Sequence, residues 1–424
     1  METTIPGDYR LTIGQRFFAH RFEMWPNSSR PNQRMYRLND NFNYGAFVKA
    51  VQHTIDSHAG LRIRLFREKE EWRQYFPNQK ANVVGEVLDG SKPDQCLSYA
   101  KKVILEEAYR AMDLKYECPV KAKVVNVNEQ YWLSLCGDHM AIDEIGFNLL
   151  EKEIEKAYRI IINGESLPEV SQEPYINYLK KEETRKATEE RNLLYWQQQL
   201  KGAPMLIDTS KNGQVSANFY VYELTGEHYE ILLDFCKRNK FSLFNILTAV
   251  HLLLMAESGK RDDLVISFVI ANRFSPEEQN LIINLVMLLH VRFSVNQNEP
   301  LPDFLTRVKE TSIAALVHRN YDYASLYRAM AAEARQNGCF PNLGRECNLI
   351  VDDDPMQFPN SLFMERMEQK PKGNFQTMKT GFSIYAEQTP KNLNAKVTWD
   401  SSTWVISSEE MAVRFPQIIN QFMD

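Results

Sequence analysis

The sequence has few of the features that mark membrane, secreted or low-complexity proteins. Its most apolar stretch, Leu243 to Met255, is too short and too interrupted to span a bilayer. Residues Met1–Arg10 have no apolar core of the kind found in signal peptides. The six cysteines are scattered without a CxxC pair, which favours reduced thiols in a cytoplasmic protein. Glycine and proline are scarce, at 17 and 18 of 424 residues, which excludes a collagen-like or low-complexity chain.

Basic and acidic residues are nearly balanced. The chain has 50 basic and 55 acidic residues and a formal net charge of −5, so it lacks the overall positive charge of a nucleic-acid-binding protein. A local basic patch could still hold an anionic protein partner. Hydrophobic residues make up 44% and charged residues 25%, a balance typical of a globular protein, and the length alone allows roughly two to three domains.

Several common catalytic motifs are also missing. The sequence contains no GxxxxGK[ST] loop, no GxGxxG after a strand and no GxSxG nucleophile elbow. It has no HExxH or paired HxH, so no metal site is expected. The acidic triplet 352–354 precedes a proline and is interpreted as a solvated turn.

What is present is an alternation of helical and strand patterns. Helices are predicted around Phe47–Ile55 and Ile145–Tyr158, and over 175–200, 227–240, 243–258, 302–318, 323–332 and from Ser407 onwards. Strands are predicted over 61–65, 121–127, 131–136, 264–271, 290–295, 381–385 and 395–399. A polar segment with two prolines, 166–174, separates two halves of similar character. We therefore expect an α/β protein with an N-terminal lobe over 1–170 and a C-terminal lobe over 171–424.

The loop Gly137–Glu144 offers the clearest chemistry, because it lies between a predicted strand and a predicted amphipathic helix. His139 could take a proton from an amine or a hydroxyl, since its ordinary pKa lies near neutral pH. Asp143 could fix the loop through a charge-assisted bond to an arginine. A histidine followed by an acidic residue four positions later is expected roughly once by chance in this composition. A buried loop histidine held by backbone groups is therefore the alternative interpretation.

A series of segments, in order, resembles the condensation domains of nonribosomal peptide synthetases, which belong to the chloramphenicol acetyltransferase-like superfamily. The segments are Leu11–Arg16, Ser57–Arg64, Asp138–Glu144, Tyr178 with Tyr195–Pro204, Val265–Arg273, Leu281–Arg292 and Trp399-Asp400. The resemblance covers nearly the whole chain. It implies two chloramphenicol acetyltransferase-like lobes in a V-shaped pseudo-dimer, with the active site at their junction.

The resemblance also implies a reaction and its residues. An acyl group passes from a phosphopantetheine thioester on a carrier protein to an amine or hydroxyl, without a metal or other cofactor. His139 takes the position of the catalytic histidine, and Asp143 that of the motif's structural acid. Arg273 is the expected ion-pair partner of Asp143, with Arg62 as the second candidate.

Three positions depart from the family pattern. Asp138 replaces the first motif histidine, a structural position, and a carboxylate there could favour the charged form of His139. Met287 replaces an asparagine in the region expected to line the substrate tunnel or contact the acceptor. Glu144 replaces a glycine, and three roles remain open for it: recognition of a cationic acceptor, plugging of the tunnel, or a favourable charge at the start of the following helix.

The sequence therefore predicts a free-standing condensation enzyme, because Met1 lies close before the first motif and Asp424 lies just after the last. Carrier proteins, and an amine or alcohol that is carrier-bound or free, are the expected partners, with no role for nucleic acid or membrane. One alternative is a catalytically degenerate platform that binds carrier proteins or recruits a tailoring enzyme. Another is a different reaction, such as cyclisation, on a carrier-bound substrate.

Overall fold

The chain divides into two compact units. In the computed structural model the described residues are 8–24, 32–38, 42–69, 71–77, 112–127, 130–203, 206–208, 216–336, 339–341, 345–351, 363–367 and 381–423. The first unit comprises Met1–Ala187, Ala271–Val286 and Phe358–Lys370, and the second comprises Thr188–Ile270, Met287–Gln357 and Pro371–Asp424. This division differs from the predicted lobes 1–170 and 171–424, because three segments beyond residue 170 belong to the first unit. The acidic triplet 352–354 lies outside the described residues.

The first unit is built on two antiparallel sheets. A four-stranded sheet has the order β13-β2-β6-β5, and a three-stranded sheet has the order β1-β4-β3. The predicted hairpin is confirmed, since β5 and β6 pair antiparallel from Val120↔Gly137 to Val127↔Gln130. The elements are β1 (Tyr9–Arg10), α1 (Ile13–Met24), β2 (Asn32–Leu38), α2 (Tyr44–Ser57), the 3-10 helix η1 (Ala59–Arg62), β3 (Arg64–Glu68), β4 (Glu71–Tyr75), β5 (Val120–Val127), β6 (Gln130–Gly137), α4 (Glu144–Ile162), α5 (Glu173–Thr184), α9 (Pro276–Gln279) and β13 (Phe363–Met367).

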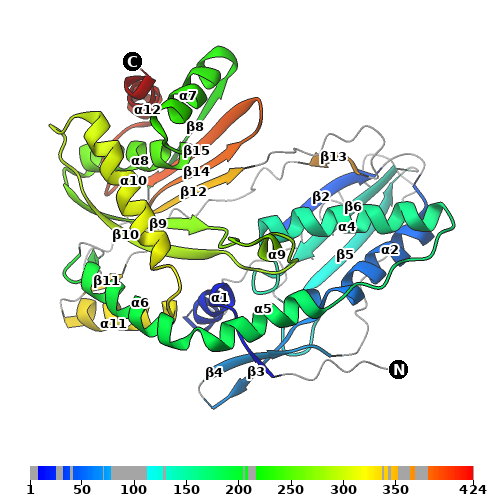
Figure 1. Ribbon diagram of the computed structural model, residues 1–424. Helices are drawn as coiled ribbons and strands as arrows, with labels where there is room; N and C mark the ends of the chain where they lie inside the picture. The colour runs from blue at the N-terminus through cyan, green and yellow to red at the C-terminus, as the bar shows by residue number, and fades with distance from the viewer. Residues whose placement is uncertain are drawn as a thin grey trace. The chain divides into compact units, whose positions relative to one another are not determined.

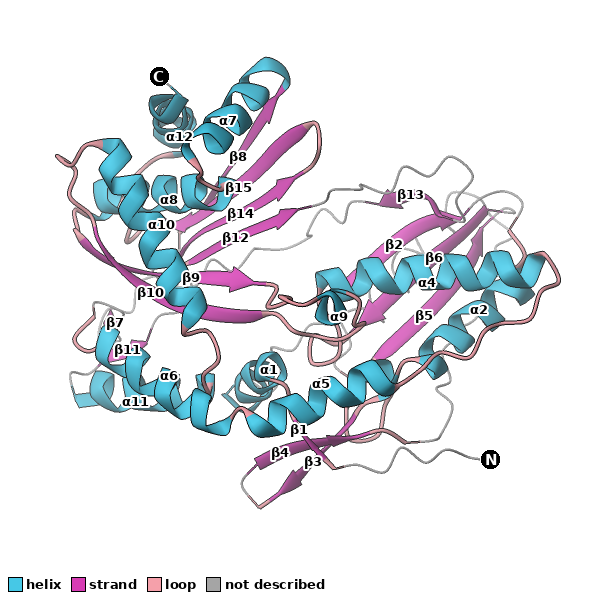
Figure 2. Cartoon of the chain, in the orientation of Figure 1, coloured by secondary structure: helices cyan, strands magenta, loops and turns pink. Residues whose placement is uncertain are grey.

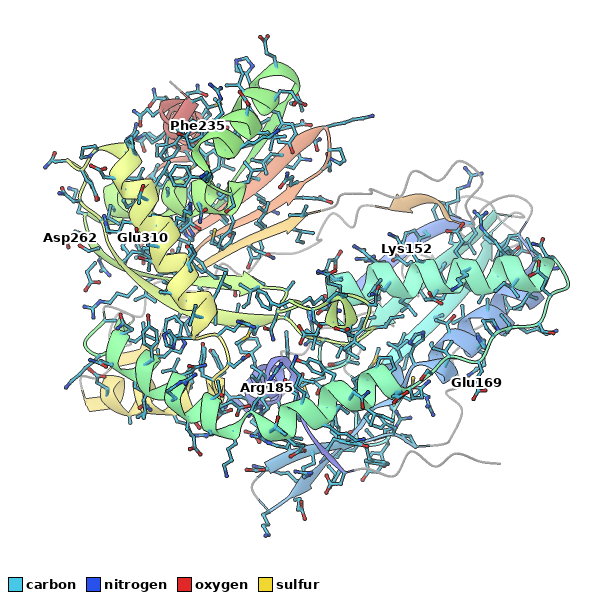
Figure 3. The ribbon with its side chains drawn as sticks, viewed as in Figure 1. Lys152, Glu169, Arg185, Phe235, Asp262 and Glu310 are labelled. Carbon is cyan, nitrogen blue, oxygen red and sulfur yellow. The ribbon has the colours of Figure 1, made fainter. Side chains whose placement is uncertain are left out.

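Helices α2 and α4 lie along one face of the four-stranded sheet (Figure 1). The inward residues of α2 recur at helical spacing, as predicted, and Phe47, Val51 and Ile55 are fully buried. They join one apolar cluster with Ile154 of α4 and Leu135 of β6. The opposite face of α4 carries exposed residues such as Lys152 (Figure 3). The loop before α4 is therefore anchored to a rigid layer.

The second unit contains a six-stranded mixed sheet with helices on it (Figure 2). Its order is β10-β9-β12-β14-β15-β8, and β12 runs parallel to its neighbours β9 and β14. The elements are α6 (Lys186–Gln199), β7 (Leu206–Asp208), β8 (Ala217–Thr225), α7 (Gly226–Asn239), α8 (Leu243–Gly259), β9 (Asp263–Ile270), β10 (Met287–Ser294), α10 (Leu301–Val317), α11 (Tyr323–Gln336), β11 (Cys339–Pro341), β12 (Glu346–Val351), β14 (Phe382–Gln388), β15 (Asn392–Asp400) and α12 (Ser408–Met423).

Helix α8 forms the centre of the second unit. Ser242 and Asn245 make a reciprocal capping box at its start, as the sequence indicated for Ser242. Almost all of its side chains are buried, because it contacts β9, β12 and β14 as well as α10 and α12. Among the described residues no single helix is long and apolar enough to cross a membrane; α7 and α8 pass that test only as a pair, which is bent by 102°.

Two predicted elements were wrong in detail. The single helix expected over 175–200 is two helices, α5 and α6, separated at Arg185 (Figure 3), whose main-chain N–H donates to the Glu182 carbonyl in a tighter turn than that of an α-helix. The strand expected over 61–65 begins only at Arg64, because residues 59–62 form a 3-10 turn. Leu61 and Ile63 are both buried while Arg62 is not. The 3-10 turn thus gives a strand-like alternation only over 61–63, since Arg64 and Leu65 are both buried.

Candidate active site

The loop 138–143 joins β6 to α4 and is folded around Asp138. The main-chain N–H of Asp138 donates to the Pro119 carbonyl at 2.8 Å, and its carboxylate Oδ1 accepts from the Met140 N–H at 2.8 Å. Its carbonyl accepts from the Ala141 N–H at 2.9 Å. An aspartate suits this buried turn because its short side chain can satisfy nearby backbone N–H groups. Asp138 thus organises the loop through its own backbone and carboxylate.

Asp143 ends the loop and caps helix α4. Its Oδ1 accepts from the Gly146 N–H at 2.7 Å, and its Oδ2 accepts from the Leu285 N–H at 2.9 Å. Nη2 of Arg273 donates to both carboxylate oxygens, at 2.9 and 3.1 Å. Both side chains are buried, at 5% and 2% exposure. One carboxylate thus fixes the first turn of the helix and ties it to residues far along the chain.

The ion pair between Asp143 and Arg273 is the one the sequence led us to expect. The Arg273 guanidinium also donates to the carbonyls of Glu278, Leu281 and Ile283 at 2.7, 2.8 and 2.9 Å. Arg62, the second candidate, instead donates to the Pro77 carbonyl at 2.9 Å. Burial lowers the pKa of Arg62 below its ordinary value. Arg273 is therefore the partner that locks the end of the loop.

His139 is half-buried and lies near the start of this loop, directly after Asp138. Its imidazole stacks on the ring of Phe18 in α1, with ring centroids 4.8 Å apart and planes 12° apart. Its carbonyl oxygen accepts a hydrogen bond from the side-chain amide of Asn284, which is fully buried. Both the ring and the backbone of His139 are therefore held by side chains of the first unit.

Sequence reasoning did not single out Phe18 or Asn284. Phe18 follows the segment Leu11–Arg16 by two positions, and Asn284 lies inside Leu281–Arg292. The only available signal was their proximity to segments that had already been recognised. Neither residue type carries a catalytic pattern by itself.

Glu144 begins helix α4 and forms an ion pair with Arg34 of β2. The distance from Arg34 Nη2 to Glu144 Oε1 is 2.5 Å, and Arg34 Nη2 also donates to the Glu144 carbonyl at 3.1 Å. The Arg34 guanidinium lies over the Phe147 ring, 5.2 Å from its centroid. The glutamate side chain remains 37% exposed, whereas that of Arg34 is buried. The helix cap itself is supplied by Asp143, so Glu144 adds a paired negative charge in the first turn.

Arg34 is shared by two carboxylates. Nη1 donates to Oε1 of the buried Glu151 at 2.8 Å, and the Tyr36 hydroxyl donates to the same oxygen. Burial alone would lower the pKa of Arg34, but Glu151 and Glu144 outweigh it and hold that pKa above its ordinary value. The guanidinium therefore stays charged and fixes the first two turns of α4 to β2.

Met287 belongs to the second unit, whereas the other predicted site residues belong to the first. It is the first residue of β10 in the second unit, is buried, and pairs with Ile270 of β9. Its predicted place at the substrate tunnel stays a prediction. Among the described residues no group of three or more histidine, cysteine or acidic side chains is arranged to hold a metal ion.

The sequence profile of the Condensation domain family matches residues 5–422. The chain therefore belongs to the condensation domains, a class of enzymes that transfer acyl or peptidyl groups and form amide or ester bonds. It is 26% identical over 306 residues to the nonribosomal peptide synthetase kk1B of Curvularia clavata, covering 69% of this chain and 2% of that protein. It is 22% identical over 250 residues to bacitracin synthase 3 of Bacillus licheniformis, covering 57% of this chain and 4% of that protein. The chain thus spans a small fraction of the length of these curated relatives.

Solved structures share the fold. The condensation enzyme VibH aligns with a TM-score of 0.74 at 17% identity, covering 97% of this chain and 95% of that one. The starter condensation domain of the rhizomide synthetase RzmA aligns with a TM-score of 0.73 at 14% identity, covering 99% and 96%. These matches confirm the predicted α/β fold class of the condensation domains.

Proposed function

We propose that this chain joins an acyl group, carried as a thioester on the phosphopantetheine arm of a carrier protein, to an amine or a hydroxyl. The product would be an amide or an ester of a nonribosomal peptide type of natural product. Membership of the family supports this proposal, as do the nonribosomal peptide synthetases among the relatives. The single observation that carries it is the intact loop, in which the lock between Asp143 and Arg273 secures the segment bearing His139.

In the proposed reaction the imidazole of His139 accepts a proton from the acceptor as its nitrogen or oxygen attacks the thioester carbonyl carbon. The new C–N or C–O bond forms, the C–S bond breaks, and the proton passes to the leaving sulfur to give a thiol. The two reactants supply every atom and electron of this transfer, so it needs no redox cofactor, and the proposed route assigns the proton transfer to His139 without a metal. General-base assistance of this kind contributes about 10²–10⁴-fold, and alignment of two bound substrates supplies much of the remainder.

The altered motif is compatible with this chemistry. Asp138, in place of the first motif histidine, builds the turn that presents His139. Glu144, in place of the glycine, is held by Arg34. These contacts keep the loop organised with both replacements in place, as the proposed catalysis requires.

The test is product formation by His139→Ala. A carrier protein loaded with an acyl thioester is mixed with an amine acceptor, and the product and the carrier are followed by intact-mass measurement. We expect the rate to fall by about 10²–10⁴-fold. The control is His228→Ala, an exposed histidine of α7 in the second unit, which should keep full activity.

Each other outcome has a distinct meaning. An unchanged rate in His139→Ala would show that this histidine is not the base. A carrier thioester that changes mass without acyl transfer would indicate a rearrangement such as cyclisation. A folded wild-type protein that binds the carrier protein and a tailoring enzyme but forms no product would support the platform alternative.

A further inference from the structure

The segment 283–285 contacts both ends of the loop that carries His139. At one end the Leu285 N–H donates to Asp143, and at the other the side chain of Asn284 donates to the carbonyl of His139. All of these residues belong to the first unit. The ion pair of Asp143 thus secures only the end of the loop, and a separate contact secures the backbone at the histidine itself.

The amide of Asn284 is oriented by a second hydrogen bond. Its side-chain oxygen accepts from the Val286 N–H at 2.9 Å, which leaves the amide nitrogen to face the His139 carbonyl. The side chain is fully buried, so water does not compete for either bond. A carboxylate of the same shape could still accept from Val286, but it would place a second acceptor against the His139 carbonyl.

The segment that carries Asn284 is itself held by close backbone packing. A Cβ atom at Gly14 would lie 2.6 Å from the Val286 carbonyl oxygen, and one at Gly60 would lie 2.9 Å from the Ile282 carbonyl oxygen. Only glycine allows the chain to approach so closely at these two points. The Thr12 hydroxyl also donates to the Asn284 carbonyl at 3.4 Å. The backbone segment that carries Asn284 is therefore held in place by its neighbours.

We propose that Asn284 is a positioning residue for His139. Its amide fixes the carbonyl, and hence the backbone, of the histidine, while Phe18 supports the plane of the ring. Because the direction of a side chain follows from its backbone, loss of this bond would let the imidazole take several orientations. The contribution of Asn284 to catalysis rests on the proposed acyl transfer. Its effect on the orientation of the His139 ring does not depend on that proposal.

The test compares Asn284→Asp with Asn284→Leu. The aspartate repels the His139 carbonyl, and the leucine removes the donor without adding a charge, so an effect common to both comes from the lost hydrogen bond. We expect kcat to fall by about 10- to 100-fold with KM nearly unchanged, because a displacement of about 1 Å near the reacting atoms can cost 10²-fold.

The matched control is Asn192→Asp, another buried asparagine, which donates to the Asn320 carbonyl at 2.9 Å in the second unit. It should lower thermal stability and leave kcat unchanged.

A double mutant separates positioning from general damage to the fold. In the His139→Ala background, Asn284→Leu should cause no further loss of the residual rate, because the residue acts through the histidine. A further drop as large as that seen in the wild-type background would overturn the proposal.

An NMR measurement that requires no catalysis tests the positioning role of Asn284 separately from the proposed acyl transfer. The ring resonances of His139 are followed by NMR across a pH titration, and are assigned by their absence in His139→Ala. In folded Asn284→Leu we expect them to shift and broaden, and unchanged resonances would contradict the positioning role. Altered resonances in a protein whose wild type forms no amide or ester would leave the positioning role standing and refute the proposed function.

Discussion

Two arginines fix the helix that follows the active loop, and each is surrounded by acceptors. Arg273 binds Asp143 and three carbonyls, and Arg34 binds Glu144 and Glu151. A guanidinium can serve several acceptors at once because its donors have a fixed planar arrangement, which lysine does not offer. The position of the helix start is thus defined by charged groups whose removal leaves a buried partner uncompensated.

Arg273→Met should destabilise the protein by about 3–5 kcal/mol, because it leaves the Asp143 carboxylate buried without its partner. Urea unfolding at neutral pH measures this loss. The control is Arg159→Met, which removes an exposed i,i+4 pair with Glu155 of 2.7 Å and should cost less than about 0.5 kcal/mol. Equal effects of the two substitutions would show that the buried pair contributes nothing special.

Glu144→Gln tests the three roles that the sequence left open for this residue. Because Arg34 already neutralises Glu144 and retains Glu151 in the variant, we expect turnover with neutral and with cationic acceptors to change by less than about fivefold, equivalent to about 1 kcal/mol. Steady-state rates with a matched pair of acceptors, one bearing an extra ammonium group, measure the effect. A selective loss with the cationic acceptor would indicate recognition instead. Faster turnover of bulky acceptors by Glu144→Gly would indicate a plug.

Helices α7 and α8 both end on a lysine in the left-handed region. Lys240 and Lys260 have φ angles of 56° and 50°. A side chain there is strained by roughly 1–2 kcal/mol, whereas glycine adopts this conformation freely. The backbone geometry of these two helix ends is therefore better suited to glycine than to lysine.

Lys240→Gly should raise the free energy of unfolding by about 0.5–1 kcal/mol, the strain removed less the entropy that glycine adds to the unfolded chain. The matched control, Lys237→Gly, places the same exchange inside the last turn of α7 and should destabilise by about 1 kcal/mol. Chemical unfolding of both variants measures whether the free energy of unfolding rises in the first and falls in the second. A loss of stability in Lys240→Gly would contradict the strain argument.

The elements that the sequence predicted best are those with local signals. The capping box at Ser242 gave α8 with nearly correct bounds, and the period of Phe47, Val51 and Ile55 located α2 without giving its ends. The break at Arg185 had no such signal, because the helical pattern of charged residues continues across it. The periodicity of apolar residues indicates which side chains face inward, but it does not indicate where one residue interrupts a helix.

For the site, the residues that could be predicted were those that carry motif chemistry. His139, Asp143 and Arg273 followed from the family resemblance, and the contact between the last two is present although they lie 130 positions apart. Phe18 and Asn284 contact His139 across 121 and 145 positions, through a ring face and an amide that many unrelated positions could offer. Such contacts depend on the tertiary fold and have no local pattern in the sequence.

Two fully buried histidines, His251 and His290, make the stability of the second unit sensitive to acid. Burial lowers the pKa of His251 to about 3 and that of His290 to about 4. The unfolded chain binds protons at these residues from about pH 6.5 downwards, while the folded protein does not. Their contribution to stability is thus complete above pH 6.5 and is lost as the pH falls through this range towards the folded pKa values.

We expect the free energy of unfolding to fall between pH 6.5 and about 4, by about 3 kcal/mol for His290 alone. In the folded protein the Ser267 hydroxyl lies 2.8 Å from its Nδ1, so His290→Gln keeps a polar group there. This variant should show a shallower fall, measured by urea unfolding at several pH values. His228→Gln, at an exposed position of α7, should leave the slope unchanged. A wild-type protein whose stability does not change over this range would contradict the prediction.

Residues 271–286 belong to the first unit although the chain before and after them belongs to the second, and this limits how hybrids of such proteins can be made. This segment leaves the second unit at the end of β9, supplies Arg273 and Asn284 to the first unit, and returns at the start of β10. A chimaera made at one crossover near residue 170 would therefore pair one parent's His139 loop with the other parent's arginine and asparagine. Parents that differ around 281–286 would give poorly matched hybrids even where every catalytic residue is retained. Functional exchange of the first unit requires 1–187, 271–286 and 358–370 to be inherited together.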